Sequence, residues 1–348
     1  MNINKEFMPS VANTIGTDLT KYKVIKKNQF AYNPMQVGRD RTIRVARYPN
    51  DDSAIISPAY KIFQVIDENI LLPEFLMLYF RRSEFDRVCW FHTDSSIRGS
   101  MDWSKFCDLE IPLPNLEVQK KIVDIYQFFN ERIELKERIN NNLEKISSRL
   151  YSNLIYDEKD LEFIELKEIC KFIKGRKPKE ISEQYKSDFE DYLTIEVLSN
   201  QNQIFAFDEK GIKAKEMDIL MVMDGASSGK LFYGKKGLVG STLAKIDVKE
   251  DYIELVYQFL KINEKYITEN TTGSAIPHTD KGLVLSLSLP ISEKLTEYSD
   301  KFKNIRLAIN SNNNEIMKLQ HLRDILLPKL MSGEIDVSKI NCDLIFLN

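Results

Sequence analysis

Two segments of the chain, 178 residues apart, follow the same pattern and restrict what the chain can fold into. In the first, Asp102 precedes Pro112 by ten residues, and in the second, Asp280 precedes Pro290 by ten. Apolar residues alternate with polar ones before each proline, and a long segment of polar and apolar residues follows. A pattern that recurs at a fixed spacing usually marks a repeated structural unit. The chain is therefore predicted to contain two related units, and to recognise a partner with two comparable halves.

Each repeat continues into a long amphipathic helix. From Asn115, a candidate N-cap, to Leu154, apolar residues recur every three or four positions apart from one gap of six, and no glycine or proline interrupts them. At about 1.5 Å per residue, this helix would span roughly 58 Å. The same periodicity resumes between 295 and 330, after the candidate cap Ser292 and before Gly333.

Both predicted helices contain three consecutive asparagines, at 140–142 and 312–314. Asparagine is a poor helix former, so its return at matched places supports the duplication. Asparagines on the seam of a helix pair would set its register. Alternatively, all six lie on the solvent-facing side.

The sequence between and before the helices is a mixture of short apolar strands, turns and helical segments. We expect an α+β fold in which two globular α/β domains are separated by two long antiparallel helices, as a pseudo-twofold dumbbell. A helix that packs only on its own globule is the alternative. The predicted domains are 1–112, 157–290 and the helices 113–156 and 291–335, followed by a tail at 336–348.

Composition excludes several classes of protein. The chain has 348 residues, 43% of them apolar, which is enough for two domains with real cores. It has no apolar run of 18 residues and no apolar leader, so a cytoplasmic protein without a membrane segment is expected. Its four cysteines form no Cys-x-x-Cys pair, which speaks against a zinc site or a disulfide framework.

A net charge of −3 argues against a nonspecific cationic nucleic-acid binder, but the charge is unevenly distributed. Residues 20–47 hold eight positive side chains and one negative, and residues 170–180 hold five positive and one negative. Basic clusters of this kind can contact phosphates. The alternative is an ordinary solvated face.

The order of these features resembles the specificity subunits of type I restriction-modification enzymes. The proline-rich entry to the first helix, at 111–122, is IPLPNLEVQKKI, and the end of the second, at 322–335, is LRDILLPKLMSGEI. Within the globules, KNQFAYNPM at 27–35 and DILMVMDGASSGK at 218–230 are similar to corresponding strands of the two target-recognition domains. The resemblance covers nearly the whole chain, and it is the order and spacing of these motifs that make it specific.

The resemblance implies a DNA-recognition subunit without catalytic, cofactor or metal sites of its own. Each globule would read one half of a bipartite, asymmetric site in double-stranded DNA, and the helices would set the gap between the halves. Two modification subunits, which carry S-adenosylmethionine, would dock on the helices. Motor-nuclease restriction subunits, which use ATP and Mg, would then join the complex.

Side chains that can read base edges or phosphates gather in the turns of both globules. In the first, the candidates are Asn33, Gln36, Arg39, Arg41 and Arg98. In the second, they are Arg176, Lys177, Ser227, Ser228, Lys230 and His278.

Two motifs could suggest other chemistry. The segment from Gly225 to Lys230 has three residues between its glycines where a phosphate loop needs four, and Leu231 follows the lysine in place of Ser or Thr. It is interpreted as a loop facing DNA or as an ordinary turn between strands. Asn33-Pro34-Met35 lacks the second proline and the aromatic residue of an adenine methyltransferase site, so methylation by this chain itself is not expected.

One departure from the family concerns the first globule. Leu161 and Asp218 are 57 residues apart, whereas Met1 and Gln29 are 28 apart, so the first globule is expected to lack about 29 residues at its start. Three other hypotheses remain open: a scaffold whose helix pair binds only protein, a modification enzyme acting alone, and a specificity subunit of a related multi-subunit restriction enzyme.

Overall fold

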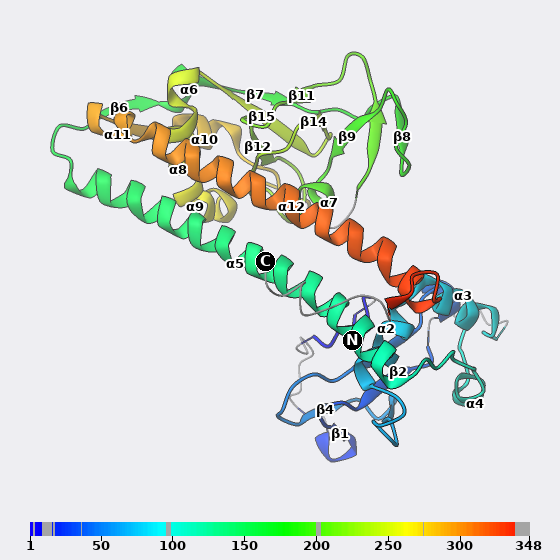
Figure 1. The fold of residues 1–348 in the computed structure, drawn as a ribbon. Helices are drawn as coiled ribbons and strands as arrows, with labels where there is room; N and C mark the ends of the chain where they lie inside the picture. Colours follow the sequence, from blue (N-terminus) through cyan, green and yellow to red (C-terminus); the bar gives the residue numbers. More distant parts are fainter. Residues whose placement is uncertain are drawn as a thin grey trace. The chain divides into compact units, whose positions relative to one another are not determined.

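The chain forms two compact units, and each takes part of both long helices (Figure 1). Unit 1 comprises Met1–Ile133 and Leu319–Asn348, and unit 2 comprises Glu134–Lys318. The computed structural model describes residues 1–2, 4–8, 16, 18–35, 37–94, 99–199, 203–273 and 275–337. The long helices are α5 (Leu116–Asp157) and α12 (Ser299–Met331), so the predicted combination of mixed sheets with two long helices is confirmed.

Unit 1 is built on a three-stranded antiparallel sheet with strand order β3-β2-β5. Apolar residues of β2 pack with α2 and α4 into a core rich in stacked and edge-on aromatic rings, among them Phe30, Phe63, Phe80 and Phe106. The described elements are η1 (Leu19–Lys21), β1 (Lys23–Ile25), β2 (Phe30–Asn33), α1 (Val37–Asp40), β3 (Arg44–Arg47), β4 (Ala54–Ile56), β5 (Lys61–Phe63), α2 (Pro73–Arg81), α3 (Ser83–Phe91) and α4 (Trp103–Cys107).

Unit 2 contains a four-stranded antiparallel sheet of order β13-β12-β15-β7, a five-stranded sheet of order β11-β14-β9-β10-β8, and the pair β16-β6. Its strands are β6 (Glu162–Glu165), β7 (Cys170–Lys174), β8 (Glu180–Ser182), β9 (Glu190–Leu193), β10 (Phe205–Phe207), β11 (Lys213–Ala214), β12 (Ile219–Val222), β13 (Leu231–Tyr233), β14 (Gly237–Val239), β15 (Leu243–Val248) and β16 (Ser288–Ile291). Its short helices are α6 (Leu166–Ile169), α7 (Ile195–Leu198), η2 (Glu250–Tyr252), α8 (Ile253–Ile262), α9 (Glu264–Glu269), α10 (Lys281–Ser286) and α11 (Glu293–Glu297).

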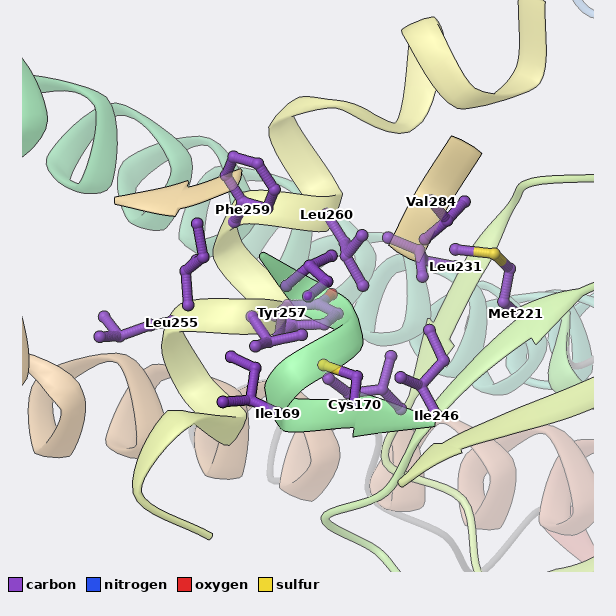
Figure 2. Close-up of a cluster of buried hydrophobic side chains, with 14 of the residues drawn as sticks. Ile169, Cys170, Met221, Leu231, Ile246, Leu255, Tyr257, Phe259, Leu260 and Val284 are labelled. Carbon is purple, nitrogen blue, oxygen red and sulfur yellow. The ribbon is translucent and has the colours of Figure 1, made fainter. Parts of the chain in front are cut away.

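The main core of unit 2 lies between the four-stranded sheet and the helices beside it (Figure 2). Leu255 and Leu260 of α8 are fully buried there with Met221 of β12 and Ile246 of β15. Tyr151 of α5 and Phe302 of α12 belong to the same cluster. The long helices therefore contribute to the core of this unit.

The two units repeat one order of elements. In unit 1, β2 lies between β3 and β5, and α2, α3 and α4 follow before the long helix α5. In unit 2, β12 lies between β13 and β15, and α8, α9 and α10 follow before α11 and α12. Among the described residues, unit 2 has six strands, β6 to β11, before its central strand β12, whereas unit 1 has only β1 before β2.

The aspartates that open the sequence repeat have the same structural role. The carboxylate of Asp102 accepts a hydrogen bond from the Trp103 N–H at 2.9 Å and caps α4. That of Asp280 accepts one from the Leu283 N–H at 3.0 Å and caps α10. Each short helix leads through a proline-containing segment toward a long helix, so the duplication predicted from the sequence is confirmed.

The start of α5 agrees with the sequence prediction, whereas the start of α12 differs from it. The Asn115 side chain accepts from the Val118 N–H at 2.9 Å, and α5 begins at Leu116 as expected. Ser292 does act as an N-cap, but it caps α11 rather than the long helix. A turn at Tyr298, whose N–H bonds to Leu295 three residues back, separates α11 from α12. A hydrogen bond between residues three apart, as in a 3-10 helix, tightens the helix locally and interrupts its regular α-helical geometry.

Within each unit, α5 and α12 run antiparallel. In unit 2, the Asn140 amide donates to Asn313 Oδ1 at 2.9 Å and accepts from the Asn312 amide at 2.8 Å. In unit 1, the Arg323 guanidinium donates to Asn130 at 2.8 Å. Three of the six asparagines therefore lie on the seam between the helices, while the other three (Asn141, Asn142 and Asn314) are exposed.

Asn140→Ala should lower the free energy of unfolding of unit 2 by about 1–2 kcal/mol, because both partner amides would lose a hydrogen bond in a half-buried place. The exposed neighbour gives a matched control, and Asn141→Ala should change stability by less than about 0.5 kcal/mol. Chemical denaturation of the two variants measures the difference. Equal effects would show that the amide layer does not stabilise the helix pair.

No helix among the described residues is both long and apolar enough to cross a membrane.

Candidate nucleic-acid interface

Two segments come together in each unit: the loop after the central strand, and the stretch just before the capping aspartate. In unit 1, the Gly38 N–H donates to the Gly99 carbonyl at 3.0 Å, and the Met101 N–H donates to the Pro34 carbonyl at 3.0 Å. In unit 2, the Gly225 N–H donates to the Pro277 carbonyl at 2.9 Å, and the Thr279 N–H to that of Met223 at 2.8 Å. Equivalent backbone hydrogen bonds thus join the same pair of segments in both units.

Most of the side chains predicted to read DNA lie on these segments. Asn33, Arg39 and Arg41 belong to or border the first segment of unit 1, and Ser227, Ser228 and Lys230 belong to the first segment of unit 2. His278 belongs to the second segment of unit 2. Gln36 and Arg98 lie outside the described residues. Arg176 and Lys177 belong to neither segment and follow β7 along the chain.

In unit 1, the predicted side chains are partly engaged with the protein. Arg39 pairs with Asp40 at 2.7 Å, and the resulting hydrogen bond lowers the pKa of the Asp40 carboxyl, assisted by Arg44 at 2.6 Å. Asn33 Oδ1 accepts from the Met35 N–H at 3.0 Å and so shapes the turn. Arg41 has a left-handed backbone, with φ of 51°, and its guanidinium lies 5.0 Å from the centre of the Trp90 ring.

The basic cluster at 20–47 is less positive in the structure than in the sequence. Lys27 pairs with Asp51 at 2.6 Å, and Arg47 pairs with Glu74 at 2.7 Å. Both acids lie outside residues 20–47 in the sequence, and the fold brings them next to the basic side chains. Counting charges along the chain therefore overestimated the positive charge that this surface offers to phosphates.

In unit 2, the two segments border a pocket of about 280 Å³. Ser228 is almost completely buried, and its hydroxyl lies 2.7 Å from the Gly225 carbonyl and 2.8 Å from the Pro277 carbonyl. It holds the loop closed and is not available to a ligand at the surface. Lys230 is exposed, with its ammonium 5.0 Å from the centre of the Phe232 ring. The pocket is lined by Ala226, Ser227, Ser228, Lys230, Glu264, Thr268, Thr271 and Pro277.

Two residues that the sequence did not single out complete this surface. Asp224 Oδ1 lies 2.8 Å from His278 Nδ1, and the Lys174 ammonium lies 2.8 Å from the other carboxylate oxygen. Burial opposes ionisation of the Asp224 carboxyl, but the hydrogen bonds from Lys174 and His278 outweigh it and lower its pKa. These residues are 50 and 54 residues from Asp224 along the chain, so no local motif could have revealed the cluster.

Lys174 also connects the second basic cluster to the loop. It ends β7, and Arg176 follows two residues later and pairs with Asp208 at 3.3 Å. Lys177 is exposed. The basic cluster at 170–180 therefore contacts the candidate interface through Lys174. Lys174 belongs to that cluster but was not among the predicted DNA contacts.

Among the residues that the structure describes, no three His, Cys, Asp or Glu side chains cluster as a metal site. The described cysteines, Cys89, Cys107 and Cys170, are free thiols, and burial raises the pKa of Cys89 and of Cys170 to about 12. A thiol with so high a pKa is protonated at neutral pH and is a poor nucleophile.

Comparison with known proteins agrees with the duplicated architecture. A family model described as the type I restriction modification DNA specificity domain matches residues 4–145 and again residues 158–320. The specificity subunit of the type I restriction enzyme MjaIX from Methanocaldococcus jannaschii is 23% identical over 79% of this chain and 72% of its own length. The MjaVIII specificity subunit of the same organism is 29% identical over 43% of this chain, and the match spans only 38% of that relative.

A solved structure shares the fold. The crystal structure of a type I restriction-modification S subunit from M. genitalium superposes with a TM-score of 0.54 at 20% identity, covering 88% of this chain and 84% of the other. The family model matches most of the chain, in two ranges that coincide with the two repeats. The chain therefore belongs to the family of type I restriction-modification DNA specificity domains.

Proposed function

We propose that the chain is the DNA-specificity subunit of a type I restriction-modification complex, and that each unit reads one half of a bipartite site in double-stranded DNA. The observation that carries the proposal is the pair of segments joined by equivalent hydrogen bonds in both units. They bear different side chains: Asn33, Arg39 and Arg41 in unit 1, and Lys230 and His278 in unit 2. Because the two units present different side chains on the same backbone arrangement, they are suited to two half-sites of different sequence.

Within each unit, some side chains would recognise bases and others would position the DNA backbone. Arginine, asparagine and histidine can hydrogen-bond base edges in the major groove, whereas lysines mainly contact phosphates. Arg176 and Lys177, which lie on β7's extension, would hold the backbone of the second half-site, with Lys230 beside the pocket. Gln36, Arg98 and Ser227 remain predicted contacts. The chain itself would carry out no chemical step.

The modification subunits would dock on α5 and α12. Leu135, Ile139 and Ile146 of α5 are 50%, 40% and 55% exposed, and their spacing of four and seven residues places them on one face of the helix. This apolar stripe lies away from the seam that Asn140 forms with α12. An exposed stripe with such spacing is suited to packing against another helix.

In the complex, S-adenosylmethionine would be bound by the modification subunits, and ATP and Mg by the restriction subunits, in the cytoplasm. The long helices, each shared by both units, would set the gap between the half-sites. Because the gap is a property of the helices and the bases are read by the loops, substitutions in the loops would change the motif without changing the gap.

Methylation sequencing of cells that express this chain with its modification subunit tests the proposal. We expect a split motif with two different halves and a constant gap. A continuous motif, or methylation by the modification subunit without this chain, would contradict it. No sequence-selective methylation despite a stable complex would instead favour a scaffold that binds only protein.

A further inference from the structure

His278 is held more firmly than a surface histidine requires. Its backbone N–H donates to the Thr272 carbonyl at 2.7 Å, and the Thr272 N–H donates back to the His278 carbonyl at 2.8 Å. Gly273 has φ of +91°, and a Cβ there would lie 3.0 Å from His278 Cδ2, so the ring fits closely against a residue without a side chain. Nδ1 is bound to Asp224, yet half of the side chain is exposed. The imidazole is thus oriented in advance at the surface.

The hydrogen bond to Asp224 determines which ring nitrogen carries the proton. An ionised carboxylate can only accept hydrogen bonds, and the low pKa of the Asp224 carboxyl keeps it ionised. Nδ1 of His278 must therefore be the donor. In a neutral imidazole only one nitrogen carries hydrogen, so Nε2 is left as an acceptor.

Lys174 and the ring bind different oxygens of the Asp224 carboxylate. The Lys174 ammonium lies 2.8 Å from the second oxygen, which leaves the first to accept from Nδ1 of His278. A neutral ring with Nε2 as acceptor cannot donate to a phosphate oxygen. It can accept from an amino group, and in the major groove the amino groups are adenine N6 and cytosine N4.

We propose that Asp224 is a positioning residue for sequence recognition: it fixes the tautomer of His278 so that Nε2 accepts from the amino group of an adenine or cytosine in the half-site of unit 2. The inference rests on the proposed function of this surface and deepens it, because it names the class of base that one side chain selects. It also explains the position of a carboxylate among basic residues on a surface that meets DNA.

Asp224→Asn provides a test because Lys174 determines how the new amide turns. The lysine can only donate, so the amide oxygen faces Lys174 and the amide nitrogen faces His278. That nitrogen donates to Nδ1, the tautomer reverses, and Nε2 becomes a donor. At one position of the motif, the preference should change from adenine or cytosine to guanine or thymine, by about tenfold, while the other half-site and the gap stay the same.

Two further variants make the result specific. His278→Ala should relax the same position without a new preference. Asp247→Asn is the matched control, because Asp247 pairs with Lys171 at 3.2 Å on the neighbouring strand and has no contact with His278 among those described. This control should leave the motif unchanged.

The tautomer can be read directly in the intact chain, which has three histidines. Nitrogen-15 NMR of labelled histidine should show His278 with hydrogen on Nδ1 in the wild type and on Nε2 in Asp224→Asn. Hydrogen on Nε2 in the wild type would overturn the proposal, as would an unchanged motif in both Asp224→Asn and His278→Ala. Failure of the wild-type chain to direct a split motif would instead overturn the proposed function, while the tautomer result would still stand.

Discussion

A chain in which Leu135, Ile139 and Ile146 are all replaced by Glu should fail to assemble with the modification subunit. The three side chains form the exposed stripe on α5, and a partner helix that packs there would have to bury three carboxylates without counter-charges. Burying an unpaired charge costs several kcal/mol, so we expect affinity to fall by at least about 100-fold. Co-purification and size-exclusion chromatography of the mixed subunits measure the loss.

The control for this triple variant adds the same charge to the same helix at other places. It carries three substitutions at exposed positions outside the stripe: Gln127→Glu, Asn141→Glu and Ser152→Glu. This second triple variant should assemble like the wild type. Because the stripe is exposed, both variants should also keep the thermal stability of the parent chain. If the stripe variant assembles normally, the modification subunit docks elsewhere.

Phe302→Ala should lower the free energy of unfolding of unit 2 by about 3–5 kcal/mol, the usual cost of removing a buried phenylalanine side chain. The Phe302 ring of α12 is fully buried and lies 6.0 Å, edge to face, from the Tyr151 ring of α5. Its removal would leave a cavity where both long helices join the main core of the unit. Urea unfolding, followed by hydrogen exchange of peptides from residues 134–318, measures the loss.

Leu307→Ala is the matched control for Phe302, since Leu307 lies on the same helix and is 42% exposed. It should cost less than about 1 kcal/mol because it removes little buried surface. If the two substitutions were equally harmful, burial of Phe302 in the core would not explain the destabilisation. If both were harmless, α12 would not depend on this contact.

The long helices could be predicted because their signal is local. Residues three and four apart share a helix face, so the apolar period from 115 to 154 was sufficient to locate α5, which runs Leu116–Asp157. The candidate caps Asn115 and Ser292 could be recognised for the same reason, since a cap bonds within three residues. The interruption at Tyr298 was missed because the apolar period continues through it.

The candidate site was only partly predictable. Small and polar residues marked the loop that begins at Gly225, but burial of the Ser228 hydroxyl depends on carbonyl groups from another segment. Asp224 could not be identified from its neighbours, because its partners Lys174 and His278 come from β7 and from the stretch before α10. Contacts between distant segments depend on topology, which composition does not reveal.

By itself, the sequence determined the duplication and the two amphipathic helices, since a repeated pattern is visible by comparing two segments and a helical period depends on residues within a few positions of one another. Only the tertiary structure decided which cations are already paired, as Lys27 is with Asp51 and Arg47 with Glu74. It also decided which nitrogen of His278 faces outward, through a carboxylate 54 residues away. Hydrogen bonds and ion pairs act over a few ångströms in space, and only the folded chain brings such distant residues within that range.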